Sequence, residues 1–170
     1  MRRRLVVESA AHGLTGPGDR PDVEAVEIAR VALRALPLAT AQAELDLDLV
    51  ANLAGRSVAS LQVVENQLPE LLELAPQFVS VQVGANDVCL FDDDTPATYA
   101  ENMAQVLDTI LGVVDANRTV VLTIPDFTLA PSPPDTCRDE PEQQAERIRQ
   151  LNGILATLAG ERGVTVVDIS

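Results

Sequence analysis

The chain has 170 residues, which is the size of one ordinary domain, and 46% of them are hydrophobic. Acidic residues number 26 against 12 basic ones, and the net charge of -14 repels phosphate backbones and anionic lipid head groups. Aromatic residues make up only 2%, and no apolar run approaches the roughly 18 residues of a membrane-spanning helix. We therefore expect one globular domain over residues 1–170, with no nucleic-acid partner and no membrane span.

The first half of the chain alternates short apolar runs with helical patterns. Leu5-Val6-Val7 is rich in β-branched residues and predicts a buried strand. Apolar residues at helical spacing predict a helix over 22–36, between two prolines. A strand is expected over 45–53 and a helix over 57–74, capped by Ser57 and interrupted at Pro69.

The second half repeats this alternation. Strands are predicted over 78–83, 119–124 and 164–168, and helices over 95–114 and 140–159. Strands that alternate with long helices imply right-handed crossovers and a parallel sheet covered on both faces. The sequence thus predicts an α/β fold, a three-layer α/β/α sandwich around five parallel strands.

Ligands of such sheets bind beyond the carboxyl ends of the strands, so the residues that follow each strand are the first candidates for chemistry. Ser9 follows the first strand, Gly55 follows the second, and Asn86 follows the third within Gly-Ala-Asn-Asp. The Asn86 amide could donate a hydrogen bond to a developing oxyanion, and a glycine at position 55 lets the backbone N-H of the turn face a ligand. Taken singly, each residue also suits an ordinary turn or helix cap.

Taken together, Glu8-Ser9, Asn52 to Gly55 and Gly84-Ala85-Asn86-Asp87 resemble the SGNH, or GDSL-like, hydrolase family in order, spacing and strand assignment. Thr123-Ile124-Pro125-Asp126 is similar to the fourth-strand end of the small esterases in that family. The resemblance implies a flavodoxin-like α/β/α sandwich that hydrolyses carboxylic esters without a cofactor. It makes Ser9 the nucleophile and gives the oxyanion hole to Ser9, Gly55 and Asn86, although an ungapped alignment from Asn52 places Ser57 at the glycine position.

The chain departs from the family pattern in two places. The family's Gly-Asp-Ser reads Val7-Glu8-Ser9, and the base-bearing Asp-x-x-His is absent from the 170 residues. The only histidine is His12, three residues after Ser9, where we expect a turn or solvent-facing residue and no base. Three interpretations stay open: an ester hydrolase of small molecules, a binding domain that has lost hydrolysis, and a fragment truncated before its last block.

Four further features carry weaker expectations. Cys89 and Cys137 lack the spacing of a metal site, and free buried thiols are favoured over a bridge between them. Consecutive carboxylates at Asp92, Asp93 and Asp94 suit a solvated loop better than a metal site, and Asp168 is assigned a structural role. The N-terminus has no signal-peptide pattern, which predicts a cytoplasmic location.

Overall fold

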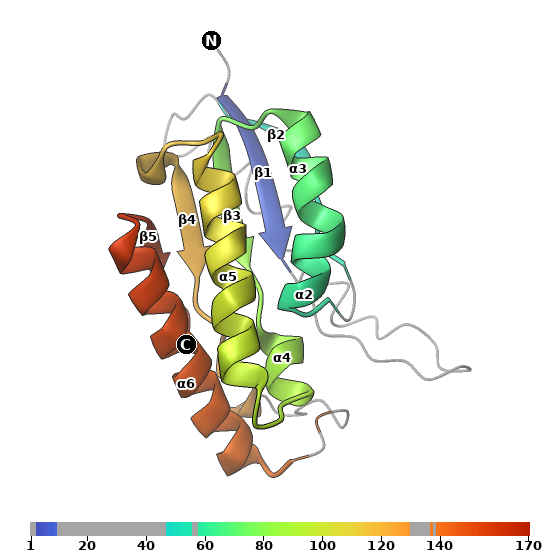
Figure 1. Ribbon diagram of the computed structural model, residues 1–170, viewed down its shortest axis with the longest axis vertical. Helices are drawn as coiled ribbons and strands as arrows, with labels where there is room; N and C mark the ends of the chain where they lie inside the picture. Colours follow the sequence, from blue (N-terminus) through green and yellow to red (C-terminus); the bar gives the residue numbers. More distant parts are fainter. Residues whose placement is uncertain (1–2, 10–46, 56–57, 130–136, 138) are drawn as a thin grey trace, which may run out of the picture.

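The computed structural model describes residues 3–9, 47–55, 58–129, 137 and 139–170. The described residues form five strands and a set of helices in alternation (Figure 1). Strand bounds are β1 (Arg3–Ser9), β2 (Leu47–Asn52), β3 (Phe78–Gln82), β4 (Thr119–Leu122) and β5 (Thr165–Val167). Helix bounds are α2 (Ser60–Gln62), α3 (Leu68–Leu74), α4 (Ala85–Cys89), α5 (Thr95–Leu111) and α6 (Pro141–Glu161).

The strands form one parallel sheet in the order β2-β1-β3-β4-β5. This is the flavodoxin-like order, in which the chain first moves outward from β1 to β2 and then crosses back to β3. The reversal leaves β1 between β2 and β3. The predicted α/β class and parallel sheet are confirmed.

Helices α3, α5 and α6 cover the same face of the sheet (Figure 1). Right-handed crossovers require this, because the steps from β2 to β3, β3 to β4 and β4 to β5 all run in one direction across the sheet. The helix predicted over 22–36 lies outside the described residues. None of the helices in the described part of the chain is long and apolar enough to cross a membrane.

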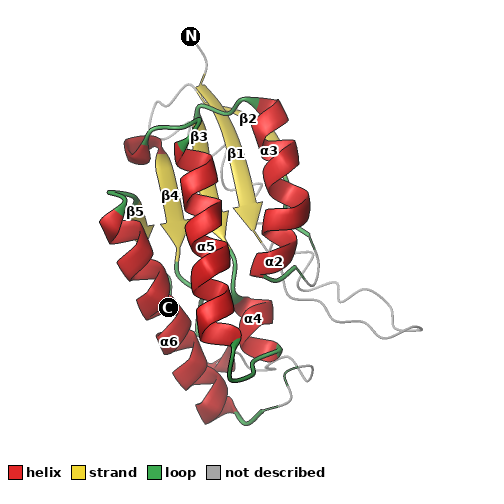
Figure 2. Ribbon diagram, viewed as in Figure 1, coloured by secondary structure: helices red, strands yellow, loops and turns green. Residues whose placement is uncertain are grey.

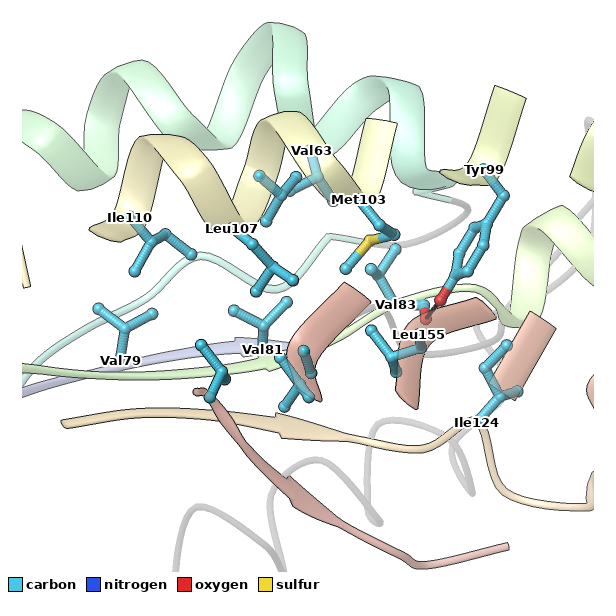
Figure 3. Packing of buried hydrophobic residues seen from close by; sticks show 14 of the residues in the cluster. Val63, Val79, Val81, Val83, Tyr99, Met103, Leu107, Ile110, Ile124 and Leu155 are labelled. Carbon is cyan, nitrogen blue, oxygen red and sulfur yellow. Dashed lines mark hydrogen bonds between the residues drawn. The ribbon is translucent and has the colours of Figure 1, made fainter. Parts of the chain in front are cut away.

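The helical layer is held to the sheet by a core of aliphatic side chains. Strand β3 alternates, with Val79 and Val81 buried and their neighbours half-buried, as one face of a pleated strand must. Figure 3 shows Met103, Leu107 and Ile110 of α5 packed over these valines. Burying each such side chain contributes about 1.5–3 kcal/mol, so these contacts hold α5 against the sheet.

The helical region after β2 is interrupted just before Pro69, the position at which the sequence predicts a break. A π-helical turn over Val63–Gln67 separates α2 from α3, and Pro69 follows within the first turn of α3. Proline has no N-H for the usual hydrogen bond to the carbonyl four residues back. The wider π-helical turn before Pro69 accommodates the missing hydrogen bond. The helix starts at Ser60, later than predicted, and Ser57 lies outside the described residues.

One element was not predicted. The segment after β3 was expected to be a loop, but Ala85–Cys89 is the short helix α4, seen at the carboxyl end of the sheet in Figure 2. Five residues are too few to show helical periodicity, and glycine at position 84 reads as a turn. The Asn86 and Asp87 side chains therefore project from a helix.

Candidate active site

The backbone of Ser9 lies at the carboxyl edge of the sheet, between β2 and β3. Ser9 is the last residue of β1 and stands in register with Gln82, the last residue of β3. On the other side of β1, Val7 is in register with Asn52, the last residue of β2. The segments that follow β2 and β3, which carry Gly55 and Asn86, therefore begin on either side of β1.

Gly84 allows β3 to turn directly into α4. Its φ of 128° is a conformation that L-residues with a side chain rarely adopt. A Cβ at this position would lie 2.4 Å from Ile124 Cδ1 and 3.2 Å from Tyr99 Cε2. Glycine at this place lets α4 begin close to the sheet, with Asn86 in its first turn.

Asn86 joins the segments that follow β2 and β3. Its side chain is 2% exposed, and its Nδ2 donates to the Val58 carbonyl oxygen at 2.9 Å. An amide nitrogen carries two N-H groups, and the bond to Val58 fixes the amide plane. Gly55 lies three residues before Val58, and a Cβ on it would come within 2.6 Å of Val58 Cγ2. The structure thus places Gly55 and Asn86 on two segments that are bonded to each other.

Asp87 adds a buried carboxylate to the same contact. Its Oδ2 accepts the Ser60 backbone N-H at 3.0 Å, and its Oδ1 accepts the Ser60 hydroxyl at 2.6 Å. Asn102 Nδ2, from α5, donates to the Ser60 Oγ at 3.0 Å. Burial raises the pKa of the Asp87 carboxyl, and the hydrogen bonds from Ser60 act in the opposite direction.

Helix side chains also satisfy the backbone at the ends of the strands. Gln67 donates to the Leu53 carbonyl at 2.8 Å, and the Tyr99 hydroxyl donates to the Val83 carbonyl at 3.2 Å (Figure 3). Asn152 of α6 bonds both backbone groups of Ile124, at 2.7 and 2.9 Å. Buried backbone groups need such partners, so these side chains define the shape of the carboxyl edge.

The sequence missed the polar residues that hold this edge, although it contained a signal for some of them. Asn102 falls in the apolar stripe of α5 formed by Tyr99, Met103 and Val106, all of them buried. A polar side chain on an apolar helix face needs a buried partner, and Gln67 follows the same rule. The partner itself could not be named, because Ser60 and Asp87 are distant in sequence.

The two cysteines are bridged, which corrects the expectation of free thiols. Cys89 and Cys137 form a disulfide that closes a sequence separation of 48 residues. The sequence could not decide this, because a bridge requires the two Cα atoms to approach to within about 7 Å, and α4 was not foreseen. The bridge joins the end of α4 to the segment before α6.

Other candidates from the sequence are placed as follows. His12 lies outside the described residues. Asp92, Asp93 and Asp94 are exposed, as expected, and the Asp92 carboxylate accepts the Thr95 hydroxyl at 2.7 Å beside the start of α5. Asp168 accepts the Thr123 hydroxyl at 3.1 Å, so it links the ends of β4 and β5. Within the described ranges, no group of three or more His, Cys, Asp or Glu side chains could hold a metal ion.

A parallel α/β sheet with buried polar groups at its carboxyl edge defines a common class of enzyme folds. The model of the GDSL-like lipase/acylhydrolase family matches residues 18–170, so the chain belongs to this family. The matched range begins after Ser9. A search of curated protein sequences gave no significant match.

Solved structures of hydrolases share the fold. A lipase/acylhydrolase from Enterococcus faecalis has a TM-score of 0.66 at 18% identity, over 99% of this chain and 76% of its own. An acetylxylan esterase from Geobacillus stearothermophilus has a TM-score of 0.63 at 13% identity, over 98% of this chain and 75% of its own. An α/β hydrolase from the metagenome of Lake Arreo, Spain, has a TM-score of 0.60 at 17% identity, over 98% and 76%. The chain therefore has the SGNH-hydrolase fold.

Proposed function

We propose that the chain is a serine ester hydrolase that acts through an acyl-enzyme. The Ser9 hydroxyl oxygen attacks the ester carbonyl, and its proton passes to a base. The tetrahedral oxyanion is held by the N-H groups of Ser9 and Gly55 and by the Asn86 amide. Collapse expels the alcohol, which takes up a proton, and water then releases the carboxylic acid and regenerates Ser9.

The position of Ser9 in the sheet is the observation that carries this proposal. Its backbone ends β1 between the two strands whose following segments hold Gly55 and Asn86. The hydrogen bond from Asn86 to Val58 ties those two segments together on the same edge. We infer that donors from both sides reach the end of β1, where a nucleophile needs them.

The reaction as proposed requires a base that these 170 residues do not supply at the family's position. The family uses the histidine of Asp-x-x-His, and the one histidine of this sequence is His12. A serine hydroxyl is a weak nucleophile without an adjacent base. The proposal therefore treats the 170 residues as the part that carries the nucleophile and the oxyanion hole.

The substrate proposed is a small carboxylic ester. The acetylxylan esterase and the lipase/acylhydrolase that share the fold are named for ester hydrolysis, which supports this substrate class. No cofactor is required by the proposed steps. For location, the sequence-based expectation is cytoplasmic, whereas a disulfide such as Cys89–Cys137 is typical of oxidising compartments.

Turnover of p-nitrophenyl acetate by matched variants of a form that carries Asp-x-x-His after Ser170 tests the proposal. Ser9→Ala should abolish turnover above the free-solution rate. Asn86→Ala should lower kcat by about 10²- to 10³-fold, the usual loss of one oxyanion donor. Asn117, which lies outside this edge on a short helical turn before β4, provides the matched control, and Asn117→Ala should retain full activity. Full activity in Asn86→Ala would show that a different group stabilises the oxyanion.

The second candidate is a binding domain with this fold that has lost hydrolysis. Val7-Glu8-Ser9 in place of the family's Gly-Asp-Ser favours it. Such a domain would bind an ester or carboxylate ligand with no Ser9-dependent turnover. Binding of acetate esters that survives Ser9→Ala, with no hydrolysis by a folded form that carries Asp-x-x-His after Ser170, would favour this candidate over the enzyme.

A further inference from the structure

Asp87 is a buried charged group for which the proposed chemistry has no use. Its residue is 8% exposed, and the proposed reaction assigns it no proton transfer. Removing a carboxylate from water is unfavourable unless donors compensate for the lost hydration. Here the compensating donors are the N-H and the hydroxyl of one residue, Ser60.

Ser60 connects three elements at this point. It is 1% exposed and begins α2, directly after the segment that contains Gly55 and Val58. Its hydroxyl donates to Asp87 of α4 and accepts from Asn102 of α5. Because the hydroxyl has a single proton, the bond from Asn102 directs that proton toward Asp87.

The neighbouring residue of α4 makes a parallel contact. Asn86 donates to the carbonyl of Val58, and Asp87 accepts from Ser60, two residues further along. Two consecutive side chains of α4 thus hold two alternate residues of the segment after β2. The segment from Val58 to Ser60, which follows Gly55, is therefore restrained against α4 at two points.

We propose that Asp87 is a positioning residue for the oxyanion hole: through Ser60 it holds the segment that carries Gly55 against α4, and so sets the geometry of the Asn86 amide. The proposal rests on the proposed function, because it assumes that Asn86 binds the oxyanion. Asn102 is the third member of this hydrogen-bonded group, since it orients the Ser60 hydroxyl. Asp87 itself touches no reacting atom.

Asp87→Asn is the sharpest perturbation because it keeps the shape and removes the charge. An amide can accept only through its oxygen, whereas the carboxylate accepts the Ser60 N-H and hydroxyl on two oxygens. Whichever way the amide is turned, its NH₂ group replaces an oxygen that accepts a Ser60 donor, the N-H at Oδ2 or the hydroxyl at Oδ1, so one of these contacts is weakened. Ser60→Ala is the second variant, since it removes the hydroxyl and retains the backbone N-H.

The test is a double-mutant cycle in p-nitrophenyl acetate hydrolysis, in the form of the protein that shows Ser9-dependent turnover. Asp87→Asn should lower kcat by about 10- to 100-fold with little change in KM, the usual range for a residue that orients a catalytic group. In Asn86→Ala the same substitution should cost less than about threefold, because the amide that it positions is already gone. Asp108→Asn, which breaks an exposed ion pair with Arg162, is the control that should leave kcat unchanged.

Each outcome has a separate meaning. If the losses from Asn86→Ala and Asp87→Asn multiply, Asp87 does not act through Asn86 and the inference fails while the proposed function stands. If Asn86→Ala retains activity, the proposed function loses its oxyanion donor. The side-chain amide resonance of Asn86, observed by NMR with ¹⁵N-asparagine, is independent of turnover. It should shift in Ser60→Ala and Asp87→Asn but not in Asp108→Asn, and an unchanged resonance in the first two would overturn the inference.

Discussion

Substituting Gly84 by alanine tests whether the turn between β3 and α4 is as tightly specified as the structure indicates. At a φ of 128° an alanine is strained, which costs roughly 1–3 kcal/mol. Its Cβ would also meet Ile124 Cδ1 at 2.4 Å and Cγ1 at 2.9 Å, and such overpacking costs about 1–3 kcal/mol more. The lower entropy of the unfolded alanine chain returns about 0.4–1 kcal/mol. We expect a net loss of about 1–5.5 kcal/mol.

Thermal unfolding followed by circular dichroism measures this loss. A chain of this length loses about 2–4 °C per kcal/mol, so Gly84→Ala should lower Tm by about 2–20 °C. Gly153→Ala is the matched control, because Gly153 lies within α6 and a Cβ there meets nothing within 4 Å. That substitution should raise stability by about 0.5–1 kcal/mol, since alanine is the better helix former. A Tm for Gly84→Ala within about 2 °C of the unsubstituted protein would refute the reasoning.

Three more predictions concern the disulfide, the buried carboxylate and the base. Reduction of Cys89–Cys137 should lower Tm by about 5–15 °C, because the disulfide closes a separation of 48 residues and contributes about 2–4 kcal/mol. The chain should stay folded at 25 °C, because a core of this size is stable without a disulfide. Unfolding on reduction would contradict this. Burial raises the pKa of Asp87 above 3.8, its ordinary value, so between pH 3.8 and the raised pKa the folded state binds more protons than the unfolded state. The contribution of Asp87 to the free energy of unfolding should therefore fall as the pH rises through this range. Urea unfolding measures this as the free energy of unfolding of the unsubstituted protein minus that of Asp87→Asn, which should decline as the pH rises. A difference that grows with pH would contradict the prediction. The 170 residues alone should hydrolyse a short-chain aryl ester at least about 10³-fold more slowly than a form that carries Asp-x-x-His after Ser170. Both forms are checked for folding, and each has a Ser9→Ala control. Equal rates that depend on Ser9 would place the base within the 170 residues.

The sequence was sufficient for the elements that have a clear period. The strands around Val79 and Val121 and the helices around Met103 and Leu151 were predicted to within a few residues, because burial of one face imposes the period directly. Right-handed crossovers allow only a few strand orders, and the family resemblance selects the flavodoxin-like one among them. Ends of elements were less well predicted, as with the start of α2 at Ser60.

Contacts between distant residues could not be predicted in the same way. The bonds from Asp87 to Ser60 and from Asn102 to Ser60 join residues 27 and 42 positions apart. Nothing in local periodicity relates such positions, and the disulfide between Cys89 and Cys137 depended on a helix too short to recognise. The candidate residues Gly55 and Asn86 were found from their place after strands, whereas the residues that hold them required the structure.

The nucleophile can be located directly by a covalent label. A p-nitrophenyl alkylphosphonate reacts with an activated serine: the serine oxygen binds phosphorus and p-nitrophenolate leaves. Trypsin does not cleave at Arg20 because Pro21 follows, so Ser9 falls in peptide 5–30, in which Thr15 is the only other hydroxyl-bearing residue. We expect fragment masses to place the phosphonyl group on Ser9, with no label in Ser9→Ala and slower labelling in Asn86→Ala. Label on another residue, or equal labelling of Ser9→Ala, would contradict the assignment of Ser9 as the nucleophile.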